Sequence, residues 1–298
     1  MSNTTLHNNK WLVLGASGQL GREWCFYLEQ EGIDYHGLTR DQLDITRPRQ
    51  IRKTLDNLVP DVIVNCSAYT HVDKAEDERV RAEQVNAVAV GELAKISADR
   101  NILLIHYSTD YVFPGALKHR KLYPDGYPET CPADPVNWYG HTKWQGEEAV
   151  RRASGRHLII RVSWLCGRVG NNFVHTMLQL SRERDHVKVV DDQLGCPSFT
   201  RPVVINTRAL VEYFMNGQET IHVSSQGETS WYEFARTIFR LAGKEMAVEA
   251  IPSSAWPTRA KRPEWSRLNI KRLSEIPGTR ILPWQEELEK LLLAHKPV

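Results

Sequence analysis

Short apolar runs alternate with longer amphipathic segments through the first half of the chain. Runs of this length, ended by small or polar residues, are typical of strands buried on both faces. The predicted strands are 11–14, 35–38, 60–65, 102–107 and 157–162. The predicted helices are 22–30, 48–58, 79–98 and 139–153. This alternation predicts an α/β fold with a doubly wound parallel sheet of the Rossmann type.

The second half alternates less regularly and predicts a smaller C-terminal substrate-binding lobe. Strands are expected at 187–190 and 221–224, and helices at 201–216, 230–241 and 283–293. Ser230 and Glu233 have the spacing of a helix capping box. We expect residues 1–165 to form the nucleotide-binding domain, joined by a returning strand and helix near 218–242. Residues 166–217 and 243–298 then form the smaller lobe.

Three glycines follow the first predicted strand directly. Gly15, Gly18 and Gly21 have G-x-x-G-x-x-G spacing, and a predicted helix comes next. Glycines permit a tight turn, and the free N–H groups of the helix N-terminus bind a pyrophosphate. After the second strand comes Arg40 rather than an acidic residue. Arg40, with or without Arg22, suits a 2′-phosphate, which favours NADPH over NADH; solvated surface charge is the alternative.

Tyr139 and Lys143 are four residues apart in a predicted helix, so both side chains lie on one face. A free tyrosine has a pKa of about 10, and a neighbouring cation lowers that pKa. The pair therefore has the form of an acid–base unit, although the same spacing also occurs on many solvent-exposed helices. Thr109, at the end of a predicted strand, offers a hydroxyl to a substrate carbonyl or to its own turn.

The bulk composition excludes several classes of protein. With 38 basic and 36 acidic residues the net charge is +2, so we expect no nucleic-acid or membrane partner. No stretch approaches the roughly 20 apolar residues of a membrane span. The five cysteines are scattered, and the polar residues 1–10 have no secretory apolar core. We therefore expect a cytoplasmic protein without disulfides.

Three further features leave alternatives open. Asn86 interrupts a helical segment and is expected to face solvent or cap a loop, with no catalytic role. Residues 114–135 form a long basic loop, either an active-site lid or a solvated face. The segment 251–267 is rich in proline, arginine and tryptophan, and it either binds a nucleotide diphosphate or packs on the smaller lobe.

Longer motifs resemble the extended short-chain dehydrogenase/reductases, and among them the dTDP-4-dehydrorhamnose reductase family. The resemblance covers residues 11–284. Its motifs are 60–65, 68–70, 72–76, 106–115, 139–143, 161–164, 170–173, 192–197, 262–263 and 266–269. It implies NADPH-dependent reduction, with NADH as an alternative donor, of the 4-keto group of a dTDP-linked 6-deoxyhexulose to give dTDP-L-rhamnose. The expected partner is thus a small nucleotide sugar.

The resemblance also assigns roles by position. Tyr139 protonates the nascent alkoxide, Lys143 holds the nicotinamide ribose and lowers the pKa of Tyr139, and Thr109 binds the keto oxygen. Substrate contacts are assigned to Asp110 and Trp164, the latter with core packing as the alternative. The cofactor-binding positions are Gly15, Gly18, Gln19, Leu20, Gly21, Asp44, Ile45, Ala68, Tyr69, Thr70, Tyr107, Tyr139 and Lys143.

The chain departs from the family at two points. The loop between Gly115 and Tyr139 is longer and more basic than the family's usual one, and the second departure concerns a metal site. Some bacterial members hold magnesium at a dimer interface through carboxylates; Glu23 matches one of them, but Arg201 replaces another. An arginine does not coordinate Mg²⁺, so we expect no bound metal. Whether the chain forms a homodimer stays open. The alternatives to a reductase are a related nucleotide-sugar epimerase or dehydratase, and a non-catalytic regulatory subunit that keeps the cofactor pocket.

Overall fold

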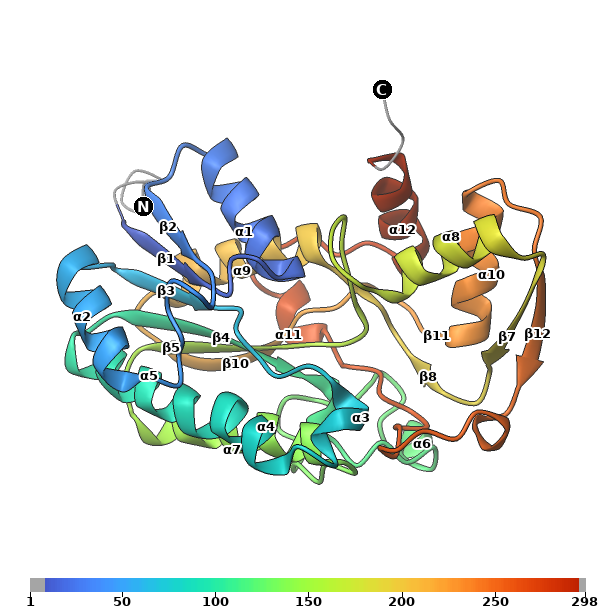
Figure 1. Cartoon of the computed structure of the whole chain (residues 1–298), viewed down its shortest axis with the longest axis horizontal. Helices are drawn as coiled ribbons and strands as arrows, with labels where there is room; N and C mark the ends of the chain where they lie inside the picture. Colours follow the sequence, from blue (N-terminus) through green and yellow to red (C-terminus); the bar gives the residue numbers. More distant parts are fainter. Residues whose placement is uncertain (1–8, 295–298) are drawn as a thin grey trace.

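The computed structural model describes residues 9–294, so most of the polar N-terminal segment lies outside the described residues. A six-stranded, wholly parallel sheet has the order β10-β5-β4-β3-β1-β2 (Figure 1). Its strands are β1 (Trp11–Leu14), β2 (Tyr35–Leu38), β3 (Val62–Asn65), β4 (Leu103–Thr109), β5 (His157–Val162) and β10 (Gln218–His222). The order reverses next to β1, as in doubly wound folds, and the predicted fold class is confirmed.

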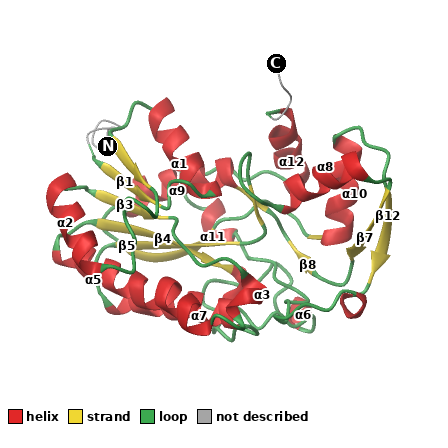
Figure 2. Cartoon of the chain, viewed as in Figure 1, coloured by secondary structure: helices red, strands yellow, loops and turns green. Residues whose placement is uncertain are grey.

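Helices cover both faces of this sheet, as Figure 2 shows in red against yellow. On one face, α1 (Gln19–Gln30) and α9 (Thr200–Phe214) contribute to a core with Trp11, Trp24 and Val203. On the other face, α2 (Pro48–Leu58), α5 (Ala89–Asp99) and α7 (Trp138–Arg152) contribute to a second core. The central strands are buried on both faces because helices cover both, which is why they are continuously apolar.

The smaller lobe has its own apolar core. Its main elements are α8 (Phe173–Glu183), β7 (His186–Val190), α10 (Trp231–Leu241), β12 (Ala247–Ile251) and α12 (Trp284–Leu293). β12 pairs with β7 in parallel. Short pairs join β8 (Leu194–Gly195) to β11 (Thr229–Ser230) and β6 (Leu165–Cys166) to β9 (Ser198–Phe199). Ser230 Oγ accepts a hydrogen bond from Glu233 N at 3.1 Å, so this predicted helix start is confirmed.

Two helices, α9 and α10, each pack in a different lobe from the one predicted for them. α9 was expected in the smaller lobe, but Val203, Val204 and Leu210 pack in the core shared with α1. α10 was expected with the large sheet, but Phe234 and Ile238 pack against α8 and α12. An amphipathic pattern shows that one helical face is buried and leaves open which partner buries it.

The long loop after β4 is packed against a distant segment, while its basic residues Lys118, Arg120 and Lys121 are exposed, as the solvated-face alternative expects. Tyr127 is fully buried, its ring stacks on Phe113 at 4.7 Å, and it also packs on Trp265. The carbonyl oxygen of Gly115 accepts hydrogen bonds from Glu264 N and Trp265 N. The loop contains a short helix, α6 (His119–Leu122). Within the described residues, no helix has the length and apolarity that crossing a bilayer requires.

Candidate active site

The glycine loop between β1 and α1 is shaped by close backbone approach. Gly15 has φ of +73°, and Gly18 N donates to Gly15 O at 3.0 Å. A Cβ on Gly21 would lie 2.2 Å from Gly15 O, so only glycine fits there. No side chain caps the start of α1, and its first turn contains no acidic residue. The N-terminus of α1 is thus open to an anionic group, as a pyrophosphate site requires.

A cavity of about 220 Å³ extends from this loop along the ends of β2 and β3. The cofactor positions expected here that line it are Gly15, Gly18, Asp44, Ile45, Ala68 and Tyr69. Arg40 also lines it, together with a second cation, Arg81, that the sequence analysis did not identify. Arg81 lies 5.7 Å from the ring of Tyr69 and pairs with Glu78 at 2.8 Å. Two arginines at the adenosine end suit a 2′-phosphate.

Other expected cofactor positions have different surroundings. Gln19 bonds to the smaller lobe, accepting from Asn172 Nδ2 at 2.9 Å. Leu20 is part of the apolar core, and Thr70 is exposed. The hydroxyl of Tyr107 is buried and bonds to Trp24 Nε1 at 2.8 Å, away from the cavity. Spacing alone does not distinguish a side chain that turns into the core from one that faces a ligand.

Tyr139 and Lys143 lie one turn apart on α7, at the carboxyl end of β4. Asn137 caps the helix by accepting from Gly140 N at 2.8 Å, which fixes the first turn that carries Tyr139. Lys143 is buried, and its Nζ donates to Tyr107 O at 2.6 Å. Lys143 also interacts electrostatically with Cys66, which lines the cofactor cavity. The structure therefore brings the pair next to the glycine turn.

The protonation of this pair differs from the expectation. Burial raises the pKa of Tyr139 to about 12, a hydrogen bond with Thr109 lowers it, and the charge of Asp110 raises it. Burial lowers the pKa of Lys143 to about 8, while Glu147 raises it. The expected lowering of the Tyr139 pKa by Lys143 is absent, because the ammonium is bound to the Tyr107 carbonyl. Tyr139 is thus protonated at neutral pH, as a proton donor must be.

Thr109 and Asp110 complete the polar end of β4. Thr109 Oγ1 accepts from Tyr111 N at 3.2 Å and donates to Asp110 Oδ1 at 3.0 Å. Asp110 is buried, and burial raises its pKa to about 7, against a hydrogen bond from Ser266. The rings of Tyr111 and Tyr139 meet edge to face at 5.7 Å. A hydroxyl, a carboxyl and a phenol therefore converge at one strand end.

Glu147 was not identified from the sequence, although it follows Lys143 by one further turn. Its side chain is fully buried and pairs with Arg161 through Oε2–Nη2 at 2.7 Å and Oε1–Nε at 2.9 Å. Arg151 adds a contact of 2.8 Å to Oε2. Burial raises the pKa of Glu147, but the neighbouring Arg161 outweighs it and the pKa falls to about 2. A permanent negative charge thus lies behind Lys143.

Asn86 is buried rather than facing solvent, and it caps a loop, the other expected use. Its Oδ1 accepts from Tyr69 N at 2.8 Å, and its Nδ2 donates to Thr142 Oγ1 at 3.1 Å. A π-helical turn, Gln84–Val88, separates α4 (Arg79–Glu83) from α5 and aims this side chain inward. Asn86 therefore joins the loop that carries Tyr69 to α7, the helix that carries Tyr139 and Lys143.

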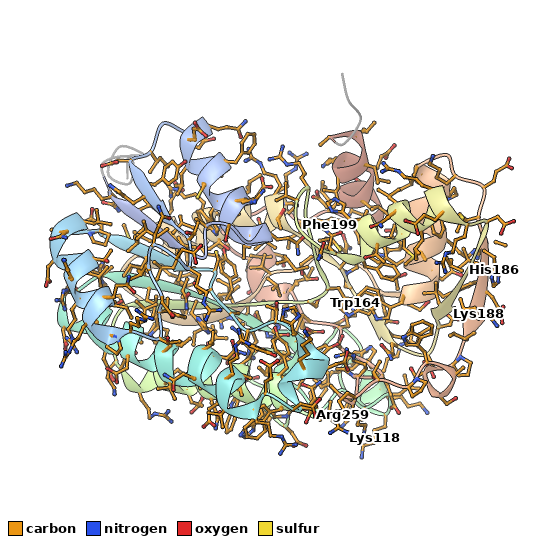
Figure 3. The ribbon with its side chains drawn as sticks, viewed as in Figure 1. Lys118, Trp164, His186, Lys188, Phe199 and Arg259 are labelled. Atoms are coloured by element: carbon orange, nitrogen blue, oxygen red, sulfur yellow. The ribbon has the colours of Figure 1, made fainter. Side chains whose placement is uncertain are left out.

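Trp164 lies between the two lobes, as Figure 3 shows. Its φ is +46°, a conformation rare for a large side chain. Its ring stacks on Trp231 with centroids 3.6 Å apart. A Cβ on Gly195 would lie 2.8 Å from the Trp164 ring. The unusual backbone is therefore held by close packing, which is common at ligand sites.

The carboxylate of Glu23 is surrounded by arginines. Its Oε1 lies 3.5 Å from both Arg168 Nη2 and Arg201 Nη1, and its Oε2 accepts from Thr200 at 3.3 Å. The described residues contain no cluster of three or more acidic, histidine or cysteine side chains arranged for a metal. Glu23 is thus bound to cations of its own chain.

Comparison with known proteins places the chain in a family. The family model described as RmlD substrate binding domain matches residues 9–296. The spore coat polysaccharide biosynthesis protein SpsK of Bacillus subtilis is 36% identical over 95% of this chain and 96% of its own length. The dTDP-4-dehydrorhamnose reductase of Escherichia coli K12 is also 36% identical, over 94% of this chain and 96% of its own.

A solved structure agrees with these relatives. The dTDP-4-dehydrorhamnose reductase of Bacillus anthracis, in complex with NADP, has a TM-score of 0.90 and 35% identity, covering 96% of this chain and 99% of that one. The glycine loop, the two-arginine cavity and the Tyr139–Lys143 pair of this chain fit a phosphorylated dinucleotide. The family resemblance predicted from the motifs is confirmed, and the chain belongs to the RmlD family of dTDP-4-dehydrorhamnose reductases.

Proposed function

We propose that the protein reduces the 4-keto group of dTDP-4-dehydro-6-deoxy-L-mannose to give dTDP-L-rhamnose, with NADPH as hydride donor. Membership of the RmlD family supports the reaction, and the relative solved with NADP supports the cofactor. The observation that carries the proposal is the convergence of Thr109, Tyr139 and Lys143 at the end of β4, beside the glycine loop. Arg40 and Arg81 are the residues that would hold the 2′-phosphate.

NADPH, when bound, supplies a hydride to the carbonyl carbon. Thr109 donates a hydrogen bond to the carbonyl oxygen and so stabilises the charge that develops there. Tyr139, protonated because its pKa is about 12, transfers its proton to that oxygen. Lys143, whose ammonium group is held at the Tyr107 carbonyl, would bind the ribose hydroxyls of the cofactor. Asp110 and Trp164 are proposed to orient the sugar, and the buried Thr109, Asp110 and Lys143 limit the access of water to the reacting carbonyl.

Two alternatives predict different products. An epimerase would interconvert sugars without net oxidation, and a dehydratase would carry more acidic residues beside Thr109, where this chain has Asp110 followed by Tyr111. A regulatory subunit would bind NADPH without turnover. The intact set of Thr109, Tyr139 and Lys143 favours the reductase over both. The five cysteines are free, which supports a cytoplasmic location. Sedimentation of the protein would show whether it forms the homodimer that the sequence leaves open.

The experiment follows loss of nicotinamide absorbance with the 4-keto sugar nucleotide and NADPH. Tyr139→Phe is expected to lower kcat by about 10²- to 10⁴-fold, because general acid catalysis contributes on that order. NADPH affinity should change little, since the ring is kept. Tyr213→Phe, at an exposed tyrosine on α9, is the matched control and should keep full activity. Turnover that persists in Tyr139→Phe would contradict the mechanism.

A further inference from the structure

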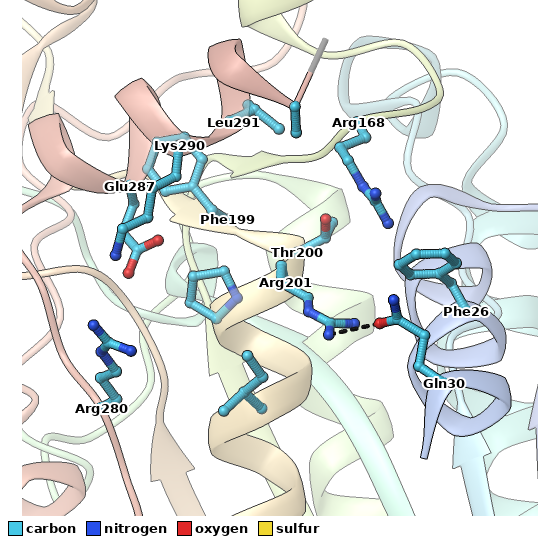
Figure 4. Close-up of a pocket in the computed structure, with 13 residues that line it drawn as sticks. Phe26, Gln30, Arg168, Phe199, Thr200, Arg201, Arg280, Glu287, Lys290 and Leu291 are labelled. Atoms are coloured by element: carbon cyan, nitrogen blue, oxygen red, sulfur yellow. Dashed lines mark hydrogen bonds between the residues drawn. The ribbon is translucent and has the colours of Figure 1, made fainter. Parts of the chain in front are cut away.

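A second cavity, of about 510 Å³, lies at the boundary between the two lobes and shares no lining residue with the cofactor cavity. Figure 4 shows it between α1 on one side and α9 and α12 on the other. Its volume is within the range of small-molecule sites. None of its lining residues belongs to the catalytic set. The proposed reaction therefore leaves it without a role.

Four cations line this cavity: Arg168, Arg201, Arg280 and Lys290. The only carboxylate among the lining residues is Glu287, so the lining carries a net charge of 4 − 1 = +3. Glu23 lies behind Arg168 and Arg201 at 3.5 Å from each and offsets one further charge. A net charge of about +2 stays available to a ligand. Like charges collected around one space favour an anion there.

The arginines on the α1 side are held in position. The Arg168 guanidinium lies 4.3 Å from the ring centroid of Phe26, a distance suited to a cation–π contact. Arg201 Nη2 donates to Gln30 Oε1 at 2.8 Å, the bond dashed in Figure 4. Arg201 Nη1 has the 3.5 Å contact with Glu23 but makes no hydrogen bond to any described residue, although it is buried. These contacts fix the two guanidinium groups in the wall of the cavity, where their positive charge acts on a bound anion.

Much of the remaining lining is apolar. Phe26, Phe199, Pro202, Ile205 and Leu291 face the same space as the cations. Apolar surface of this kind gains free energy when a hydrophobic group covers it. The cavity therefore combines an anion-binding rim with an apolar floor. Inorganic phosphate would use only the first of these features.

We propose that this cavity is a binding site for a small organic anion: a phosphate or carboxylate group held by Arg201, Arg280 and Lys290, with an apolar or aromatic body against Phe26 and Phe199. The site is separate from the catalytic cleft and does not depend on the proposed function. Its walls come from both lobes, since Phe26 belongs to α1 and Lys290 to α12. A bound anion thus bridges the lobes.

The test measures binding of phenyl phosphate by calorimetry to the full chain saturated with NADP⁺ and dTDP, which fill the catalytic cleft. Phenyl phosphate is expected to bind about tenfold more tightly than inorganic phosphate, because its ring covers the apolar floor. The double variant Arg280→Gln/Lys290→Gln should bind roughly tenfold more weakly. Both side chains are exposed, so the fold and the reductase activity should be unchanged.

The matched control is Lys188→Gln/Arg236→Gln, which removes two exposed cations elsewhere on the smaller lobe and should bind as the parent does. Equal affinity for phenyl phosphate and inorganic phosphate, or equal weakening in both double variants, would overturn the proposal. So would a dimer, seen by sedimentation, that Arg280→Gln/Lys290→Gln dissociates while phenyl phosphate does not bind. That outcome would assign the cavity to a contact between two copies of the chain.

Discussion

The protonation state of Lys143 depends on the charge of Glu147, a residue with no direct part in the proposed reaction. Burial lowers its pKa to about 8, and the carboxylate of Glu147 opposes this effect. Glu147 stays ionised because Arg161 and Arg151 both contact its oxygens. The ammonium form is present below pH 8 and is lost as the pH rises through 8. Reductase activity should therefore fall on the alkaline side near this pKa.

Glu147→Gln is expected to move the alkaline limb of the kcat/KM profile to lower pH, by about one unit. The amide has no charge, so it stabilises the ammonium less and the pKa of Lys143 falls. The measurement is kcat/KM for the sugar nucleotide against pH, with the melting temperature recorded to detect loss of folding. Glu148→Gln is the control, because Glu148 pairs with Arg151 at the surface.

An unchanged limb in folded Glu147→Gln would mean that Glu147 supports packing alone. The same shift in Glu148→Gln would contradict the role of the buried carboxylate, because that residue is partly exposed and screened by water. A lower rate with an unchanged profile would also argue against it. Arg161, now without its partner, is expected to lower the stability of the variant, since a buried charge loses its compensation.

At the level of elements, α7 is brought close to its neighbours by two glycines. A Cβ on Gly140 would lie 2.2 Å from the carbonyl oxygen of Tyr111, and a Cβ on Gly146 would lie 2.2 Å from that of Asn86. Neither position has positive φ, so the requirement is one of space. The helix that carries Tyr139 and Lys143 thus rests directly on the backbone of the turn after β4 and of the π-helical turn.

Gly140→Ala is expected to lower kcat by about 10²-fold, because a shift of roughly 1 Å in α7 separates Tyr139 from Thr109. The overpacking should also cost about 1–3 kcal/mol of stability. The measurements are kcat and the free energy of unfolding. Gly217→Ala is the control, since its Cβ would have no neighbour closer than 3.3 Å. Equal activity in the two variants would show that α7 tolerates the shift.

The sequence predicts elements better than it predicts their partners. The strands 11–14 and 157–162 lie where the apolar runs indicate, because burial on both faces leaves a local pattern. The assignments of α9 and α10 to lobes were wrong, because amphipathicity does not name a partner. Glu147, on α7, was missed because its partner Arg161 lies on a different element, β5. The prediction that Lys143 lowers the pKa of Tyr139 was wrong for a similar reason. The effect depends on where the Lys143 ammonium is bound, which the spacing of the two residues does not show.

For the whole molecule, the C-terminal segment connects the smaller lobe to the strand end that carries Thr109 and Asp110. Asp73, in the short helix α3 (Val72–Ala75), accepts from Ala260 N at 3.0 Å and pairs with Arg262 at 2.5 Å. Arg262 in turn contacts Tyr111, whose ring meets that of Tyr139. Two further residues of the same segment, Ser266 and Trp265, contact Asp110 and the packed loop after β4. On the proposed mechanism, the segment would form one wall of the substrate site.

Asp73→Asn is expected to raise KM for the sugar nucleotide about fivefold to tenfold, because losing the charge-assisted bond releases Arg262 and the wall it supports. NADPH affinity should not change, since Asp73 does not line the cofactor cavity. Asp77→Asn is the matched control: Asp77 pairs with Arg259 at 2.9 Å, but the two side chains are 61% and 67% exposed, and exposed pairs contribute little. If both variants raise KM equally, general loss of negative charge explains the effect. If NADPH affinity falls together with KM in Asp73→Asn, α3 supports the nucleotide-binding lobe itself and the segment has no separate role in holding the substrate.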